Sequence, residues 1–305
     1  MSSVTFNDRV AIVTGAGGGL GRSHALALAA RGVKVVVNDL GGAVDGTGGS
    51  ATAAQKVVDE IEAAGGEAMA SGASVTDEAG VAQMVEDASA RFGHVDILVN
   101  NAGILRDKSF SKMTMEDFRL VVDVHLIGSA NCTKAVWNHM KERQYGRICM
   151  TTSSSGMYGN FGQTNYGAAK AGLSGFMRTL VLEGAKYDIR VNTLSPTARS
   201  RMTEGLMPEE VLEKLRVEPV SQGLVYLVCD DAPNRVILCA GAGGYSLTKV
   251  FETQGINLSD DAQTAEMVAE HWGQSSDETE MEEFTNGGQQ GAKFLTRIQN
   301  GDFAA

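Results

Sequence analysis

Near its start the chain carries the arrangement that most restricts its fold: a strand, a glycine-rich turn, a helix and a second strand in direct succession. Residues 10–15, Val-Ala-Ile-Val-Thr-Gly, are an apolar run that leads into residues 15–21, Gly-Ala-Gly-Gly-Gly-Leu-Gly. The alanine-rich stretch 23–30 is predicted to be helical, and the β-branched run 33–38 to be the second strand. Backbone N–H groups at such a helix start suit a phosphate. The spacing differs from G-x-G-x-x-G, so a purely structural turn is the alternative interpretation.

An acidic residue closes the second strand. Asp39 lies 18 residues beyond Gly21, where a carboxylate suits the free ribose hydroxyls of an adenosine and repels a 2′-phosphate. Positions 17 and 18 are both glycine, so the turn has no basic side chain there that would bind such a phosphate. We therefore expect the cofactor to be NAD rather than NADP. The alternative is that Asp39 is an ordinary turn residue.

A tyrosine and a lysine are candidates for proton transfer. Tyr166 and Lys170 are four residues apart, just over one helical turn, so they lie on one face of a predicted helix. One charge at ~4 Å supplies about 4 kcal/mol at an effective dielectric near ~20, enough to lower the pKa of a tyrosine by roughly two to three. The hydroxyl of Ser153 offers a hydrogen bond to a substrate oxygen. Taken alone, such a Tyr–Lys pair is more often a surface helix contact.

With these pieces in place, the chain resembles the short-chain dehydrogenase/reductase family over about residues 6–245. Further matching motifs are Asn-Asn-Ala-Gly at 100–103, after the strand 97–99, and Asn-Thr-Leu-Ser-Pro at 192–196, after 189–191. The resemblance implies an α/β fold: a Rossmann-type, doubly wound parallel sheet with helices on both faces.

Four segments narrow the resemblance to one branch of the family. That branch oxidises (3R)-3-hydroxyacyl-CoA thioesters with NAD, and the segments that resemble it are 37–42, 104–107, 158–163 and 200–203.

The resemblance also implies roles for individual residues. The catalytic set is Ser153, Tyr166 and Lys170, and His125 stands where the family usually has the Asn that holds a water of the proton relay. A histidine between Val124 and Leu126 is equally well interpreted as a core residue. The implied cofactor-binding residues are Gly15, Gly17, Gly19, Leu20, Gly21, Asp39, Ser74, Val75, Asn101, Ala102, Gly103, Tyr166, Lys170, Pro196 and Ala198. Ser153, Phe161 and Met202 are the implied substrate-binding residues, and no metal is expected.

Two departures concern the cofactor site. Ser74 occupies a position where many relatives place an Asp against the adenine, and Thr197 one where Gly often follows the proline. Both departures lie outside the set formed by Ser153, Tyr166 and Lys170.

Strands and helices alternate without a linker from residue 6 to about 240 of the 305 residues, which predicts one sheet domain, 1–245. Residues 246–305 are a C-terminal extension, too short for an independent domain. In it we expect a helix over 260–272, an acidic segment and a loop at Gly287-Gly288. The extension is expected to pack on the main body or on a neighbouring subunit, and a disordered acidic tail is the alternative.

Charge narrows the choice of partners. The net charge of −11 disfavours nucleic acid and anionic membranes. A CoA ester would need a local basic patch. Arg106, Lys108, Arg199 and Arg201 are candidates for it, although scattered surface charges are the other interpretation.

Several features indicate the compartment. The four cysteines, Cys132, Cys149, Cys229 and Cys239, lack metal spacing and lie in apolar contexts, as in a reducing compartment. No run reaches the ~18 apolar residues of a membrane span, and no signal-peptide pattern is present. The sequence ends Asp-Phe-Ala-Ala rather than Ser-Lys-Leu. A cytoplasmic protein is expected.

Small residues line the predicted helix 166–184 at Gly167, Ala168, Ala171, Gly172 and Gly175. From the resemblance we expect a homodimer or a higher homo-oligomer.

Three functions compete at this stage. The first is an NAD-dependent (3R)-3-hydroxyacyl-CoA dehydrogenase, and the second is a dehydrogenase of hydroxysteroids or other secondary alcohols. The third is a non-catalytic dinucleotide-sensing protein, against which the intact Ser153, Tyr166 and Lys170 argue.

Overall fold

The computed structural model describes residues 4–48, 52–199 and 208–304. It divides into two compact units, Met1–Leu247 and Thr248–Ala305, and each is described by itself. Whether the extension packs on the main body or on a neighbouring subunit stays a prediction.

The first unit is built on one sheet of eight strands. The strands are β1 (Val10–Thr14), β2 (Lys34–Asn38), β3 (Ala68–Ser71), β4 (Ile97–Asn100), β5 (Gly146–Thr151), β6 (Ile189–Thr197), β7 (Ile237–Gly241) and β8 (Gly244–Thr248). Their order is β3-β2-β1-β4-β5-β6-β7-β8, and all neighbouring pairs from β3 to β7 are parallel. The chain therefore winds outward in both directions from β1 and β4, and the predicted Rossmann-type sheet is confirmed.

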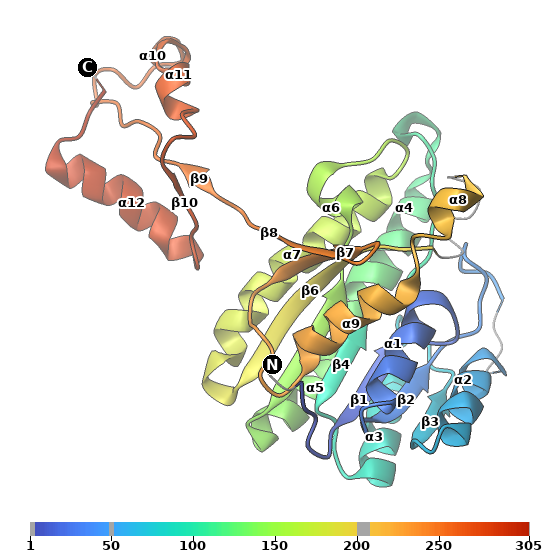
Figure 1. The fold of residues 1–305 in the computed structure, drawn as a ribbon. Helices are drawn as coiled ribbons and strands as arrows, with labels where there is room; N and C mark the ends of the chain where they lie inside the picture. Colours follow the sequence, from blue (N-terminus) through green and yellow to red (C-terminus); the bar gives the residue numbers. More distant parts are fainter. Residues whose placement is uncertain (1–3, 49–51, 200–207, 305) are drawn as a thin grey trace. The chain divides into compact units, whose positions relative to one another are not determined.

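Helices cover both faces of this sheet (Figure 1). The longer ones are α1 (Gly19–Ala29), α2 (Thr52–Ala63), α3 (Glu78–Phe92), α5 (Gly128–Arg143), α7 (Thr164–Gly184) and α9 (Val217–Val228). The shorter ones are η1 (Phe110–Lys112), α4 (Met115–Val122), the π-helical turn η2 (Asp123–Ile127), α6 (Ser154–Tyr158), η3 (Ala185–Tyr187) and α8 (Glu209–Leu212).

Two apolar cores result, one on each face of the sheet. Ala11 and Val13 of β1 pack with α1, α2 and α9, whereas Val10 and Ile12 of the same strand pack with α3, α5 and α7. Alternate side chains of a strand point to opposite faces, so a strand covered on both sides must be apolar throughout. This explains why the central strands read as continuous apolar runs.

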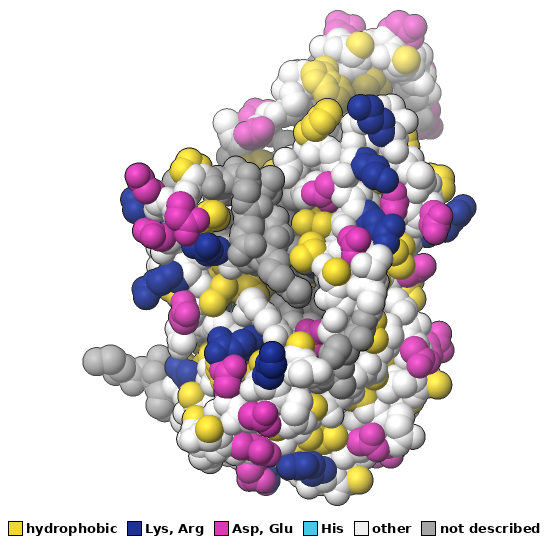
Figure 2. Space-filling view, turned by 90° about the vertical axis from the view of Figure 1, so that its right-hand side faces the viewer, with side chains coloured by type: hydrophobic (Ala, Val, Ile, Leu, Met, Phe, Trp, Pro, Cys, Tyr) yellow, Lys and Arg dark blue, Asp and Glu magenta, His cyan; other side chains and the backbone are white. Residues whose placement is uncertain are grey.

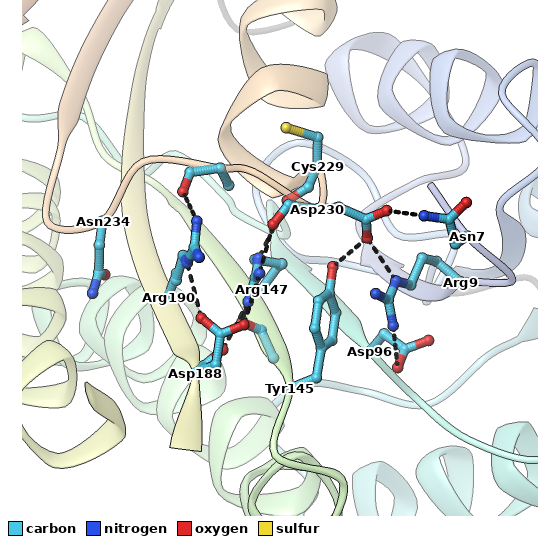
Figure 3. Close-up of polar contacts among 12 residues, drawn as sticks. Asn7, Arg9, Asp96, Tyr145, Arg147, Asp188, Arg190, Cys229, Asp230 and Asn234 are labelled. Atoms are coloured by element: carbon cyan, nitrogen blue, oxygen red, sulfur yellow. Dashed lines mark hydrogen bonds and ion pairs between the residues drawn. The ribbon is translucent and has the colours of Figure 1, made fainter. Parts of the chain in front are cut away.

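A buried polar network, which the sequence did not reveal, closes the edge of the sheet at the amino ends of its strands (Figure 3). Arg147 is only 1% exposed. Its guanidinium donates to the carbonyls of Gly146, Asp188, Cys229 and Asp230 at 2.7–3.2 Å. It also donates to the Asp188 carboxylate at 3.1 Å.

A tyrosine ring lies between two guanidinium groups in this network. The centroid of Tyr145 is 3.5 Å from the guanidinium carbon of Arg9 and 4.1 Å from that of Arg147 (Figure 3). Its hydroxyl donates to Asp230 at 3.0 Å, and Asp230 also accepts from Arg9 at 2.8 Å. Charge pairing and ring stacking together fasten β1, β5 and the end of α9 to one another.

Replacing Arg147 by Met should destabilise the protein by about 3 kcal/mol, because buried carbonyls and a carboxylate lose their donor. The free energy of unfolding in urea measures this loss. Arg91→Met is the matched control, because Arg91 is half exposed and its contact with Glu62 is a 3.9 Å surface pair. Equal unfolding free energies for the two variants would contradict the role given to the network.

The second unit contains the antiparallel strands β9 (Glu252–Thr253) and β10 (Met281–Glu282) and the helices α10 (Ala265–Glu270), α11 (Trp272–Ser275) and α12 (Gly287–Asn300). Its basic side chains tie α12 to the segment around β9. Lys293 donates to the carbonyl of Thr253 at 2.5 Å, and Arg297 to that of Gln254 at 2.6 Å.

Two expectations for this unit were wrong. The pair Gly287-Gly288 is the first turn of α12 rather than a loop, because a capping box overrides the low helix propensity of glycine. Asn286 accepts from the N–H of Gly288 at 3.0 Å, and Gln289 accepts from the N–H of Asn286 at 3.1 Å. The helix expected over 260–272 begins only at Ala265, where Thr264 caps it.

Within the ranges that the structure describes, every helix is too short or too polar to cross a membrane.

Candidate active site

The candidate residues gather at the carboxyl ends of the parallel strands. Thr14, Asn100, Thr151 and Thr197 end β1, β4, β5 and β6, and the predicted site residues follow these ends or lie in the helices packed beside them. In sheets of this type, ligands bind at this edge, beside the strands where the winding reverses.

The glycine turn after β1 is shaped by close backbone contacts. Gly15 and Gly19 have left-handed φ angles of 64° and 52°, which glycine adopts most readily. A Cβ atom at Gly21 would lie 2.1 Å from the carbonyl oxygen of Gly15. Only glycine at position 21 therefore lets α1 approach the turn this closely. The sequence pattern is therefore explained by backbone geometry.

The start of α1 fits a phosphate. Gly18 is the N-cap residue; no side chain caps the helix, and no acidic residue lies in its first turn. Added Cβ atoms at Gly18 and Gly19 would meet no heavy atom within 4 Å, so the space in front of the helix is open. Uncapped N–H groups, the positive end of the helix dipole and open space together suit the pyrophosphate of a dinucleotide.

Asp39 is fixed beside this turn. Its carboxylate accepts from the N–H of Gly17 at 2.7 Å and from that of Gly41 at 2.6 Å. A Cβ at Gly17 would lie 2.8 Å from the Asp39 carboxyl carbon. The absence of a side chain at Gly17 therefore lets the carboxylate reach the turn.

Asn101 supports the turn rather than pointing away from it. Its side-chain amide donates to the carbonyls of Thr14 and Gly15 at 2.9 and 3.1 Å. The hydroxyl of Thr14 accepts from the N–H groups of Asn101 and Ala102, both at 3.0 Å. The end of β4 is thus bound to the end of β1. Gly103 follows, and a Cβ there would lie 2.2 Å from the ring of His125.

The remaining predicted cofactor residues differ in their surroundings. The Ser74 hydroxyl lies 2.9 Å from that of Thr76 within one turn. Val75 is buried, and its carbonyl accepts from Asn131 at 3.0 Å. Leu20, in the first turn of α1, is partly buried and packs against the core. Pro196 is the residue before the last in β6, and Ala198 is buried just beyond the end of the strand.

The predicted substrate residues are less constrained. Phe161 is 91% exposed, so within this chain its ring packs against little. Met202 lies outside the described residues. Among the residues that the structure does describe, no three His, Cys, Asp or Glu side chains are grouped as a metal site.

Ser153, Tyr166 and Lys170 come together at the end of β5. Ser153 caps α6 by accepting from the N–H of Ser155 at 3.2 Å. Its side chain lies beside Tyr166 and acts to lower the pKa of that phenol. Lys170 is 3% exposed; its Nζ lies 5.4 Å from the centroid of the Tyr166 ring and donates to the carbonyl of Thr151 at 2.5 Å.

The electrostatics differ from the expectation based on sequence. Burial raises the pKa of Tyr166; the hydrogen bond from Ser153 opposes this shift, and the charge of Asp107 adds to it. Burial also lowers the pKa of Lys170 to about 7. The sequence predicts that the charge of Lys170 favours the phenolate of Tyr166, whereas in the chain by itself burial raises the pKa of that phenol.

His125 lies in the π-helical turn between α4 and α5 and is 2% exposed. Its Nε2 atom lies 2.8 Å from the carbonyl oxygen and 3.1 Å from the nitrogen of Ile104. Its ring meets that of Tyr166 edge-on, with centroids 5.1 Å apart. Burial, reinforced by the charge of Lys170, holds the pKa of His125 well below 6.5.

This geometry suits a neutral, buried histidine that packs against the candidate base. Its Nδ1 atom has no hydrogen-bond partner among the described residues. The role of His125 in a proton relay stays a prediction.

The sheet topology, the glycine turn and the Ser–Tyr–Lys group define an NAD(P)-linked oxidoreductase. The chain belongs to the short-chain dehydrogenase family, whose model matches residues 9–210.

Two curated relatives are close in sequence to most of this chain. A short-chain type dehydrogenase/reductase of Mycobacterium tuberculosis is 48% identical over 271 residues, which cover 88% of this chain and 94% of that protein. The peroxisomal multifunctional enzyme type 2 of Mus musculus is 47% identical over 275 residues, which cover 89% of this chain and 37% of that protein. The chain therefore spans little more than a third of the mouse enzyme.

A solved structure shows the same similarity. The full-length peroxisomal multifunctional enzyme type 2 from Drosophila melanogaster superposes with a TM-score of 0.82 at 37% identity, covering 97% of this chain and 50% of that one. The resemblance to the dehydrogenase unit of such multifunctional enzymes, drawn from the sequence motifs, is confirmed.

Proposed function

We propose that the protein oxidises the hydroxyl-bearing carbon of (3R)-3-hydroxyacyl-CoA-type thioesters and uses NAD as the hydride acceptor. The observation that carries the proposal is the convergence of Ser153, Tyr166 and Lys170 at the sheet edge next to the turn that holds Asp39. The substrate class rests on the resemblance of four sequence segments to that branch of the family.

The bound dinucleotide supplies the carbon that accepts a hydride. Tyr166 takes the proton of the substrate hydroxyl, and Ser153, whose side chain lies beside that phenol, orients the substrate oxygen. Because burial disfavours the tyrosinate, positive charge must gather close to it in the working enzyme. Lys170, with its pKa near 7, gains protonation as the tyrosinate forms, so the two ionisations are coupled.

Asp39 supports the choice of NAD, because its fixed carboxylate repels a 2′-phosphate. Replacing Asp39 by Ala should weaken the binding of NAD about tenfold or more and should relax the discrimination against NADP. KM values for the two cofactors measure both effects. Asp59→Ala, on the exposed face of α2, is the control. An unchanged NAD/NADP ratio in the Asp39 variant would contradict this role.

The basic patch proposed for CoA phosphates gains little support. Arg106 and Lys108 both pair with the buried Asp117 at 2.9 Å, and Arg199 pairs with Glu209 at 2.5 Å. Arg201 lies outside the described residues. On the face shown in Figure 2, basic and acidic side chains are interspersed. Recognition of the thioester therefore rests on the site itself rather than on a field of positive charge.

The deciding experiment is an NADH-formation screen of the purified protein. Both enantiomers of 3-hydroxyacyl-CoA, in several chain lengths, are compared with a panel of hydroxysteroids. The highest kcat/KM for an (R)-thioester supports the proposal, and the highest value for a steroid replaces it with the second function. Cofactor binding without NADH from any alcohol would favour the dinucleotide-sensing protein.

A homodimer, or a higher homo-oligomer, is part of the proposal. Ala168, Ala171 and Gly175 lie exposed along one side of α7, and a Cβ at Gly175 would meet no heavy atom within 4 Å. Small side chains allow a second helix to approach closely. Sedimentation velocity distinguishes a monomer from these assemblies. The cytoplasmic location stays a prediction, since the mouse and fly relatives are named peroxisomal.

A further inference from the structure

A row of side-chain hydrogen bonds leads from the surface to the candidate catalytic serine. Asp107 is exposed, and its carboxylate accepts from the side-chain nitrogen of Gln163 at 2.6 Å. The side-chain oxygen of Gln163 accepts from the hydroxyl of Ser155 at 2.7 Å. The N–H of Ser155 in turn donates to the hydroxyl oxygen of Ser153 at 3.2 Å. The mechanism described above uses neither Asp107 nor Gln163.

The direction of these bonds follows from the chemistry of the groups. An ionised carboxylate only accepts, so Asp107 holds the NH₂ of the Gln163 amide toward itself. The amide oxygen is thereby turned toward α6, where it receives Ser155 and also Asn160 at 3.1 Å. The exposed acid thus fixes the orientation of an amide that secures the start of α6.

A backbone bond strengthens the same junction. The N–H of Lys108 donates to the carbonyl of Gly162 at 2.9 Å, so the segment after β4 is bound to the turn before α7. Ser153 caps α6 from one side of this junction and Tyr166 lies in the first turn of α7 on the other. A shift of the junction would therefore change the spacing of the two hydroxyls.

Asp107 also acts on Tyr166 through its charge. The charged or titratable groups that face Tyr166 are Lys170 on α7, His125 on the π-helical turn and Asp107 on the segment after β4. Of these, Asp107 carries the negative charge and raises the pKa of the phenol. Its charge opposes formation of the tyrosinate while its hydrogen bonds hold the site together.

We propose that Asp107 is a positioning residue for the reaction: it orients Gln163, which secures Ser155 and hence Ser153. It also places a negative charge on the segment that contacts the start of α7, where the side chain of Asn165 donates to the carbonyl of Arg106 at 3.1 Å. The inference rests on the proposed function for its kinetic readout. It assigns separate tasks to the charge and to the hydrogen bonds, and the two are separable by substitution.

Asp107→Asn removes the charge and keeps an acceptor for Gln163. The pH profile of kcat/KM is measured for the alcohol that the wild type oxidises fastest. Its rising limb should shift to lower pH by roughly half a unit. Asp107→Glu should leave the limb in place. Glu183→Gln removes an equal charge at the far end of α7 and is the matched control, which should not move the limb.

Gln163→Leu removes the hydrogen bonds and keeps the charge. It should lower kcat roughly tenfold, the effect of about one hydrogen bond on positioning, without moving the limb. Thermal unfolding of each variant checks the fold, and Gln163→Met replaces the Leu variant if that one unfolds.

The proposal is overturned if Asp107→Asn leaves the limb in place, if Glu183→Gln moves it equally, or if Gln163→Leu keeps full kcat.

A second measurement separates this outcome from failure of the proposed function. The ultraviolet absorbance of tyrosinate, wild type minus Tyr166→Phe, gives the pKa of Tyr166 without turnover. If the wild type oxidises no alcohol, the proposed function fails. A lower tyrosinate midpoint with Asp107→Asn would still support the charge effect, and an unchanged midpoint would refute it.

Discussion

Replacing Tyr166 by Phe should reduce NADH formation about a thousandfold while leaving the affinity for NAD within a few-fold of the wild type. The substitution removes a single oxygen, so the packing of the ring against His125 is kept and the proton acceptor is lost. A positioned acid–base group commonly contributes 10²–10⁴-fold to a rate. Initial rates at saturating substrate give the loss in kcat, and NAD fluorescence quenching gives the affinity.

Ser111→Ala, an exposed hydroxyl on η1, is the control for loss of one oxygen and should retain full activity. Retention of most activity by Tyr166→Phe would remove the phenol from the mechanism.

Replacing Lys170 by Met should lower kcat about a hundredfold or more and should also weaken the binding of NAD. The ammonium stands beside the ring of Tyr166, with its Nζ 5.4 Å from the ring centroid. Met fills a similar volume without charge, so the tyrosinate loses its nearest stabilising partner. A loss in kcat below about threefold would contradict the coupling of the two ionisations.

The stability of the Lys170→Met variant is a second readout. The folded pKa of Lys170 is near 7, below its ordinary value of 10.5. In the window between these values the unfolded chain binds more protons than the folded one, so this lysine makes wild-type stability rise as the pH rises. The Met variant should lack that rise and should be at least as stable as the wild type near pH 7. A variant that unfolds more easily there would show that Lys170 is chiefly structural.

Much of the fold followed from local sequence patterns. The alternation of apolar strands with helical stretches predicted one sheet domain, and the resemblance to the family implied that its sheet is parallel and doubly wound. The strands were recognisable because each central strand is buried on both faces and must be apolar throughout. The glycine turn was found from a local pattern, because Gly21 is required by its contact with the carbonyl of Gly15 six residues earlier. Asp39 was found from its place at the end of the second strand, from which its carboxylate reaches Gly17. The spacing of Tyr166 and Lys170 follows from one turn of a helix.

Other features depend on contacts that only the folded chain creates. Arg9, Arg147 and Asp230 are far apart in sequence and meet only at the amino edge of the sheet. The side-chain amide of Asn101 donates to the carbonyls of Thr14 and Gly15, a contact between β4 and β1 that the sequence pattern did not indicate. The raised pKa of Tyr166 comes from burial, which a spacing rule does not convey. The start of α12 was missed because the glycines of its first turn concealed the capping box.

The central claim is that Tyr166 becomes a base only when positive charge beside it outweighs its burial. The most direct test is a titration of tyrosinate absorbance, wild type minus Tyr166→Phe, with and without saturating NAD. Without NAD we expect a midpoint above the ordinary tyrosine value of 10, and with NAD a midpoint below it. The same midpoint in both titrations would contradict the account.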